Sequence, residues 1–338
     1  MGRPYALLRA GFPYLKTLSM RRVTNFPVDL ALGQEGRIYV LCRTEAASQV
    51  RTITLEDENL GAFGSIGTGE GHFQWPTGLA VGKDETIYVS DEARHTIYRY
   101  THEGEFLGQW GEHGDRDGEF DRPSGIAFDS EDNLYVSDTM NHRVQKFTRD
   151  GKFLMSWGSF GDGEGQLNMP WGVTVDELGD VYVVDWRNDR VQKFSGAGEF
   201  IFSIGSSGSG DGEFNRPTGV EVDLHGDIYV ADAGNDRVQL FDRHGAYVQK
   251  FLGEGTLSKS GRTYMLANAR PMRLRAMSGD LDQTKLLRGP RAVRVDDKLR
   301  MYVPDYGTFR VQVYQKEAIP LDENQISPPL RSPSLQTT

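Results

Sequence analysis

The hydrophobic residues of this chain fall in short runs that are separated by glycine, aspartate and asparagine. Residues 123–157 show the pattern, because the runs GIAF, LYVSD, RVQKF and FLMSW follow one another there with polar turns between them. Such runs, rich in valine, isoleucine, tyrosine and phenylalanine, predict antiparallel strands rather than helices. We therefore expect an all-β protein.

The same four-strand pattern recurs along the chain. Each copy begins with Pro-x-Gly and contains a Tyr-Val-x-Asp strand, and the four clearest copies are spaced by 47 residues. Looser copies stand at both ends of the series, and Cys42 replaces the aspartate in the first one. Four strands in a period of about 40 to 50 residues are typical of a propeller blade. The prolines that begin the copies are Pro27, Pro76, Pro123, Pro170, Pro217 and Pro290.

The motif that follows each Tyr-Val-x-Asp strand is specific enough to suggest a family. NHRVQKF from Asn141 and NDRVQKF from Asn188 resemble the NHL repeat. The resemblance implies a six-bladed β-propeller of four-stranded antiparallel blades over residues 1–315. Blade 6 has no outer strand of its own, so we expect the N-terminal run YLKTLSM to supply it and close the ring. Residues 316–338, rich in proline and serine, are predicted to be a disordered tail.

The polar residues of the repeat favour a structural role. Asp138 ends one strand and Arg143 begins the next, and this relation recurs in other copies, where a charge-assisted hydrogen bond would order the hairpin. A catalytic group has no reason to recur in every blade. The Asp- and Gly-rich tracts before each proline lack the remaining ligands of a calcium loop, so we interpret them as turns. For His142 a binding role remains an alternative.

Composition and charge limit the possible partners. The 338 residues carry a formal net charge of -10, which argues against binding to nucleic acid or to an anionic membrane. No apolar run approaches the length of a membrane span. The single cysteine, Cys42, excludes an internal disulfide framework and suits a reducing compartment, so we expect a soluble, cytoplasmic protein. No cofactor fingerprint is visible.

A unique site in a repetitive scaffold should appear as a departure from the repeat. We predict that the innermost strands begin at the mouth of a central channel, where unusual polar and aromatic residues would form a ligand site. The alternative is a structural charge network that fills the channel with water. The candidate residues are Asp29, Trp171, Trp186, Glu221, Arg291, Arg294 and Tyr306.

A basic insertion of about residues 255–288 separates blades 5 and 6. Long insertions on one face of a fold are often lids or binding loops, so we expect this one on the face that bears Arg291 and Trp171. A merely solvated loop is the alternative.

The family resemblance also provides a test for metal chemistry. NHL-related lyases that complete peptide amidation carry zinc-binding histidines directly after such prolines, and this sequence has none there. Three converging imidazoles are not visible, so we predict no metal site.

Two functions follow from these observations. The first is a non-catalytic scaffold that binds a protein, a peptide or an anionic small ligand on the face with the insertion. The second is a lyase or hydrolase at the channel mouth, in which Arg291 or Arg294 holds an anionic substrate and Glu221 or Asp29 acts as general base. We favour the scaffold, because no nucleophile paired with a base is visible.

Overall fold

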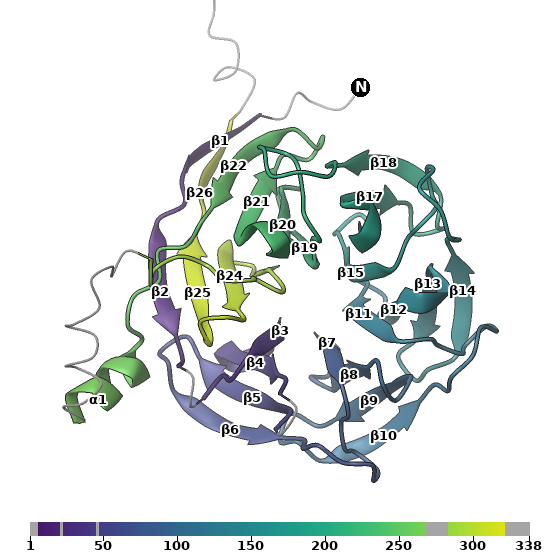
Figure 1. The fold of residues 1–338 in the computed structure, drawn as a ribbon, viewed down its shortest axis with the longest axis horizontal. Coiled ribbons are helices and arrows are strands. Elements are labelled where there is room, and N and C mark those ends of the chain that lie inside the picture. The colour runs from purple at the N-terminus through teal and green to yellow at the C-terminus, as the bar shows by residue number, and fades with distance from the viewer. Residues whose placement is uncertain (1–5, 21–22, 45–46, 268–282, 322–338) are drawn as a thin grey trace, which may run out of the picture.

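The computed structural model describes residues 6–20, 23–44, 47–267 and 283–321. They form six four-stranded antiparallel sheets that are arranged as blades around a ring (Figure 1). The expected six-bladed β-propeller is thereby confirmed.

Each blade consists of an inner strand next to the channel, followed by three strands toward the outside of the propeller. Blades 1 and 2 comprise β3 (Pro27–Leu32), β4 (Arg37–Cys42), β5 (Gln49–Thr54) and β6 (Asn59–Phe63), then β7 (Pro76–Val81), β8 (Ile87–Asp91), β9 (Thr96–Tyr100) and β10 (Phe106–Trp110). Blades 3 and 4 comprise β11 (Pro123–Phe128), β12 (Asn133–Asp138), β13 (Arg143–Thr148) and β14 (Phe153–Trp157), then β15 (Pro170–Val175), β16 (Val181–Asp185), β17 (Arg190–Phe194) and β18 (Phe200–Ile204). Blades 5 and 6 comprise β19 (Gly219–Val222), β20 (Ile228–Asp232), β21 (Arg237–Phe241) and β22 (Tyr247–Phe251), then β23 (Arg294–Val295), β24 (Arg300–Asp305), β25 (Arg310–Gln315) and β2 (Tyr14–Leu18). Short 3-10 helices are η1 (Gln34–Gly36), η2 (Thr139–Asn141), η3 (Trp186–Asn188) and η4 (Ala233–Asn235).

The hydrophobic core lies between neighbouring blades. Phe120, for example, is fully buried in a cluster that joins Tyr88 and Ile97 of blade 2 to Ile126 and Phe147 of blade 3. Strand alternation explains this arrangement, since one face of each blade packs on the preceding blade and the other on the next blade, and successive side chains point to opposite faces. Phe73, Phe120, Leu167 and Phe214, which recur at intervals of 47 residues, are all fully buried and belong to this core.

The ring is closed by the N-terminal segment, as the sequence predicts. Strand β2 pairs antiparallel with β25, so that Lys16 lies opposite Val313 and Leu18 opposite Val311. Every blade then has four strands, and the outer edge of β25 is covered.

A further strand pair lies outside the blades. β1 (Ala6–Gly11) pairs with β26 (Glu317–Leu321), which corrects the predicted disordered tail for residues 317–321. The side chain of Lys316, just before β26, is fully buried, and its Nζ lies 2.5 Å from Asp223 Oδ2 and 2.8 Å from Asp227 Oδ2. These ion pairs attach the segment to blade 5. Residues 322–338 of the predicted tail lie outside the described residues.

The described helices include none with the length and apolar character needed to cross a lipid bilayer.

Candidate functional site

The repeated aspartates hold the blades together, which supports the structural interpretation of the motif. The side chain of Asp185 is fully buried. It accepts hydrogen bonds from the backbone N–H of Asn168 at 2.7 Å and from the side chains of Asn188 at 2.8 Å, Arg190 at 2.8 Å and Gln192 at 3.2 Å. One carboxylate therefore fixes both the hairpin of its blade and the Gly-rich segment that leads into the blade.

The histidine of the motif caps the next segment of backbone. Nδ1 of His142 accepts the backbone N–H of Met169 at 3.1 Å, and His95 accepts that of Arg122 in the same way. An aspartate does the same in blade 4, where Asp189 accepts an N–H at 2.7 Å. An acceptor thus stands at this position in these three blades, and this hydrogen bond accounts for His142 without a binding role.

Three of the predicted site residues meet inside the channel. Nη2 of Arg294 lies 2.9 and 3.1 Å from the two carboxylate oxygens of Asp29, and its Nη1 lies 3.7 Å from Glu221 Oε2. Asp29 also accepts the backbone N–H of Leu79 at 2.9 Å, which links blades 6, 1 and 2. The charge network that we considered as an alternative is present.

Burial raises the pKa values of the two carboxyl groups in this network. It raises the pKa of Asp29, although Arg294 and two backbone N–H groups oppose the shift. It also raises the pKa of Glu221 to about 7, where Arg294 opposes the shift and the charge of Asp29 adds to it. With a pKa of about 7, Glu221 changes its protonation state near neutral pH.

Cavities of different size lie at the two ends of the network. A cavity of about 250 Å³ is lined mainly by aliphatic residues near the ends of the inner strands, with Glu221 and Arg294 in its wall. The cavity at the other end, lined by Trp171, Arg291 and Thr218 among others, measures about 20 Å³. The predicted mouth therefore has room for about one water molecule.

Arginines and aromatic rings surround this narrow mouth. The guanidinium of Arg291 lies 5.0 Å from the ring centre of Tyr306, and its Nε is buried without a hydrogen-bond partner. The guanidinium of Arg43 lies 4.6 Å from the ring of Trp75 and 3.8 Å from Glu92 Oε1. Burial lowers the pKa of Arg43; Glu92 opposes this shift, and the charge of Arg291 adds to it.

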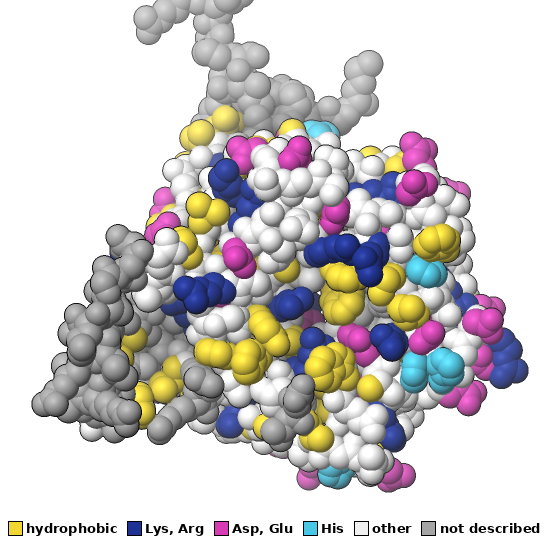
Figure 2. Space-filling view, in the orientation of Figure 1, with side chains coloured by type: hydrophobic (Ala, Val, Ile, Leu, Met, Phe, Trp, Pro, Cys, Tyr) yellow, Lys and Arg dark blue, Asp and Glu magenta, His cyan; other side chains and the backbone are white. Residues whose placement is uncertain are grey.

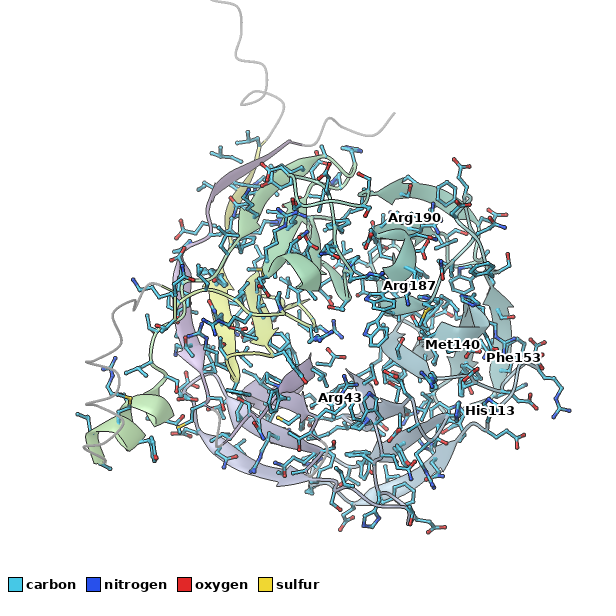
Figure 3. All side chains as sticks on the ribbon, in the orientation of Figure 1. Arg43, His113, Met140, Phe153, Arg187 and Arg190 are labelled. Carbon is cyan, nitrogen blue, oxygen red and sulfur yellow. The ribbon has the colours of Figure 1, made fainter. Side chains whose placement is uncertain are left out.

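A second aromatic group lies on the other side of the mouth. The rings of Trp171 and Trp186 lie 5.7 Å apart. The guanidiniums of Arg187 and Arg216 lie 4.9 and 4.6 Å from the ring of Trp186, and Nη1 of Arg216 is buried without a hydrogen-bond partner. Figure 3 shows Arg43 and Arg187 near the centre of the ring, and Figure 2 shows Lys and Arg side chains beside hydrophobic ones on this face.

Sequence reasoning missed Arg43, Trp75, Arg187 and Arg216. We compared positions of the inner strands and selected Trp186 and Tyr306 from the loops after the second strands, but we did not compare the loop positions in every blade. Arg43 follows the end of strand β4 at the position that Trp186 and Tyr306 occupy in their own blades, and Trp75 and Arg216 directly precede their prolines. A comparison of these positions in every blade would have found Arg43, Trp75 and Arg216, whereas Arg187 stands one residue after Trp186. We name the set Arg43, Trp75, Trp171, Trp186, Arg187, Arg216, Arg291 and Tyr306 the arginine–aromatic rim.

The first part of the insertion, through helix α1, lies away from the rim. Helix α1 (Lys259–Ala267) is at the outside of the ring near β2 and β6 (Figure 1). Backbone and hydroxyl groups of Ser260 bond to Asp57, and the backbone N–H of Thr256 bonds to Thr17 at 3.0 Å. Helix α1 therefore does not lie over the channel, whereas the carbonyl of Arg288, at the end of the insertion, accepts the backbone N–H of Gly307, next to Tyr306. Residues 268–282 lie outside the described part of the chain.

Family comparison agrees with this geometry. The fold defines a β-propeller with a polar hairpin network in its blades, and the NHL repeat matches residues 73–100, 120–147, 167–194 and 214–241. The chain is an NHL-repeat β-propeller. No curated protein sequence matches it.

Solved structures share the architecture at low sequence identity. A streptogramin B lyase aligns with a TM-score of 0.56 and 9% identity, over 93% of this chain and 98% of the other. A catalytically inactive virginiamycin B lyase from Staphylococcus aureus with quinupristin aligns at 0.56 and 12%, over 90% and 99%. A nidogen/laminin complex aligns at 0.52 and 19%, over 80% and 86%. At these identities the likeness concerns the fold alone.

Proposed function

We propose that this protein is a binding scaffold whose arginine–aromatic rim holds an acidic segment of a partner protein. The observation that carries the proposal is the set of guanidiniums without carboxylate partners. Among the described residues, Arg187, Arg216 and Arg291 lie against aromatic rings and form no ion pair. In a chain with a net charge of -10, such groups are available to an external anion.

The chemistry of the rim fits carboxylates. A guanidinium donates two parallel N–H groups to a carboxylate, and an aromatic face holds the guanidinium plane in position before the ligand arrives. Less side-chain freedom is then lost on binding. The ring of Trp186, whose centre lies 4.9 Å from the guanidinium of Arg187 and 4.6 Å from that of Arg216, supplies apolar contact area beside the charges.

The shape of the mouth favours a segment that lies across it. The cavity of about 20 Å³ behind the rim is too small to enclose an organic ligand. A peptide that passes over the mouth could still place acidic side chains on Arg43 and Arg291 on one side and on Arg187 and Arg216 on the other. We therefore favour a peptide of a partner protein over a small anionic ligand.

The test is fluorescence anisotropy with a labelled hexaglutamate peptide. Wild-type protein should bind it, with affinity that falls as salt rises, because the contacts are partly exposed ion pairs. The Arg187→Gln/Arg216→Gln variant and the Arg291→Gln variant should each weaken binding about tenfold or more, equivalent to about 1.4 kcal/mol. The control Lys298→Gln removes a positive charge from the loop between β23 and β24, at the opposite end of the inner strands, and should bind as wild type.

Three outcomes oppose the proposal. The peptide fails to bind, or all variants bind it alike, or labelled hexalysine binds equally well. The lyase or hydrolase alternative rests on the raised pKa of Glu221. Mass spectrometry of the peptide after incubation addresses it, and an unchanged mass supports the scaffold.

A further inference from the structure

Blade 2 departs from the repeat at three positions that converge in space. His95 lies between β8 and β9, His113 lies in the Gly-rich segment after β10, and Asp121 lies two residues before Pro123. Blade 3 carries His142, Phe160 and Asn168 at the same three positions, and blade 4 carries Asp189, Ser207 and Asn215. Blade 2 alone of these three combines two imidazoles with a carboxylate.

The three side chains face one another. Nδ1 of His95 lies 3.6 Å from Asp121 Oδ1, and Nε2 of His113 lies 3.8 Å from the same oxygen. The imidazole ring centres are 4.4 Å apart. One ligand atom from each residue lies within 4.8 Å of the other two. We propose that His95, His113 and Asp121 bind a divalent transition-metal ion of the zinc class, independently of the arginine–aromatic rim.

The distances permit coordination after a small movement. Zinc with ligands at about 2.1 Å in a tetrahedron separates its ligand atoms by about 3.4 Å. The distances of 3.6 and 3.8 Å to Asp121 Oδ1 are close to that value. The side chain of His113 is 67% exposed, so its rotamer can adjust.

A backbone hydrogen bond fixes the tautomer of the His95 imidazole. Nδ1 of His95 accepts the N–H of Arg122 at 3.1 Å, which places the ring proton on Nε2 and leaves the Nδ1 lone pair unprotonated. A metal ion at Nδ1 would compete with this hydrogen bond. The bond lies in an exposed environment, where water can replace the acceptor, so the loss is small.

The ligand set selects the kind of ion. Two imidazole nitrogens and one carboxylate oxygen suit zinc, cobalt, nickel or copper, whereas calcium and magnesium prefer oxygen ligands alone. The three residues are partly exposed and lie outside the channel; Figure 3 shows His113 away from the centre of the ring. At least one coordination position would remain for water or for a group of a second molecule.

The sequence alone predicts no metal site, because the three residues do not form a local motif. His95 and His113 are 18 residues apart, in two different loops, without the close spacing of a metal-binding motif. Only the fold brings the two loops to Asp121.

The test uses calorimetric titration of zinc into the whole protein, and visible spectroscopy with cobalt as a probe. Wild-type protein should bind one ion at this site. His113→Phe and Asp121→Asn introduce the residues that blade 3 carries at these positions, so the fold should tolerate them. Each should lower the affinity at least tenfold, because each removes a direct ligand. The control His244→Gln changes an imidazole of blade 5 and should bind as wild type.

A graft provides the reciprocal experiment. Phe160→His with Asn168→Asp gives blade 3 the three ligands of blade 2, with His142 already in place, and should add a second bound ion. Melting curves in a chelator should match wild type for the variants. The proposal is overturned if wild-type protein binds no zinc, or if His113→Phe and Asp121→Asn retain wild-type affinity. A graft that folds but binds no second ion would show that these three residue types are insufficient and would also count against it.

Discussion

The substitution Asp185→Ala tests whether the repeated aspartate holds its blade together. It removes a fully buried carboxylate that accepts four hydrogen bonds, one from backbone and three from side chains. Three of the donors keep another acceptor, because Asn188, Arg190 and Gln192 also bond to backbone carbonyls. The backbone N–H of Asn168 and Nε of Arg190 are the groups left without a partner.

The expected loss of stability follows from those two groups. An unsatisfied buried donor costs about 1 to 3 kcal/mol, and a charged one falls at the upper end. Partial access of water to Arg190, whose side chain is 15% exposed, reduces the penalty. We therefore expect Asp185→Ala to lower the free energy of unfolding by about 3 kcal/mol. With an unfolding entropy of about 0.7 kcal/mol/K for a chain of this length, Tm should fall by about 4 °C.

Scanning calorimetry of the wild type and the variant measures this shift. Asp180→Ala in the same blade is the matched control, since Asp180 pairs with Lys193 at the surface and Lys193 also contacts Asp176. A surface pair contributes less than about 1 kcal/mol, so the control should melt within about 1 °C of wild type. If Asp185→Ala melts with the control, the repeated aspartate does not stabilise the blade and our structural interpretation fails.

Three further predictions concern closure and charge. Deletion of residues 1–20 removes β2 and exposes β25, so calorimetry should show a Tm at least 10 °C lower; a wild-type melting curve would show that closure contributes little. Lys316→Met leaves Asp223 and Asp227 buried without their shared cation, and should lower stability in urea titration by about 3 to 5 kcal/mol; a loss below 1 kcal/mol would contradict the buried pairing. Because burial raises the pKa of Glu221 from 4.5 to about 7, wild-type protein should lose about 3 kcal/mol relative to Glu221→Gln as the pH rises from 4.5 to 7; parallel pH profiles would refute the shift.

The sequence predicted the architecture because each blade repeats the same local information. The spacing, the turn residues and the strand alternation predicted the same four strands in successive copies, so the interpretation of one copy also held for the other blades. The missing outer strand of blade 6 likewise pointed to residues 14–20, and β2 lies there. The strand pair β1–β26 was not predicted, because neither segment belongs to the repeat and no local pattern links them.

The candidate site was predicted only where the repeat provided a reference. Asp29, at one position of the inner strand, and Glu221 and Arg294, at another, were recognised because other blades carry small residues there, and the structure brings the three together. The same comparison grouped Arg291 with them, whereas its guanidinium lies against Tyr306. Arg291 precedes β23 (Arg294–Val295), so it lies outside the strand alternation that fixes the direction of a side chain, and residue spacing alone did not separate it from the other three.

Ring closure by β2 has a consequence for the synthesis of the chain. Its partner, β25, lies about 290 residues later, and ribosomes add about 5 to 20 residues per second. Residues 14–18 therefore leave the ribosome about 15 to 60 s before the strand that they pair with. During this interval the segment must remain accessible, and a chain truncated before residue 310 has nothing to complete the last blade with. The ring can therefore close only after residues 310–315 have been synthesised, because both ends of the blade-forming sequence are then present.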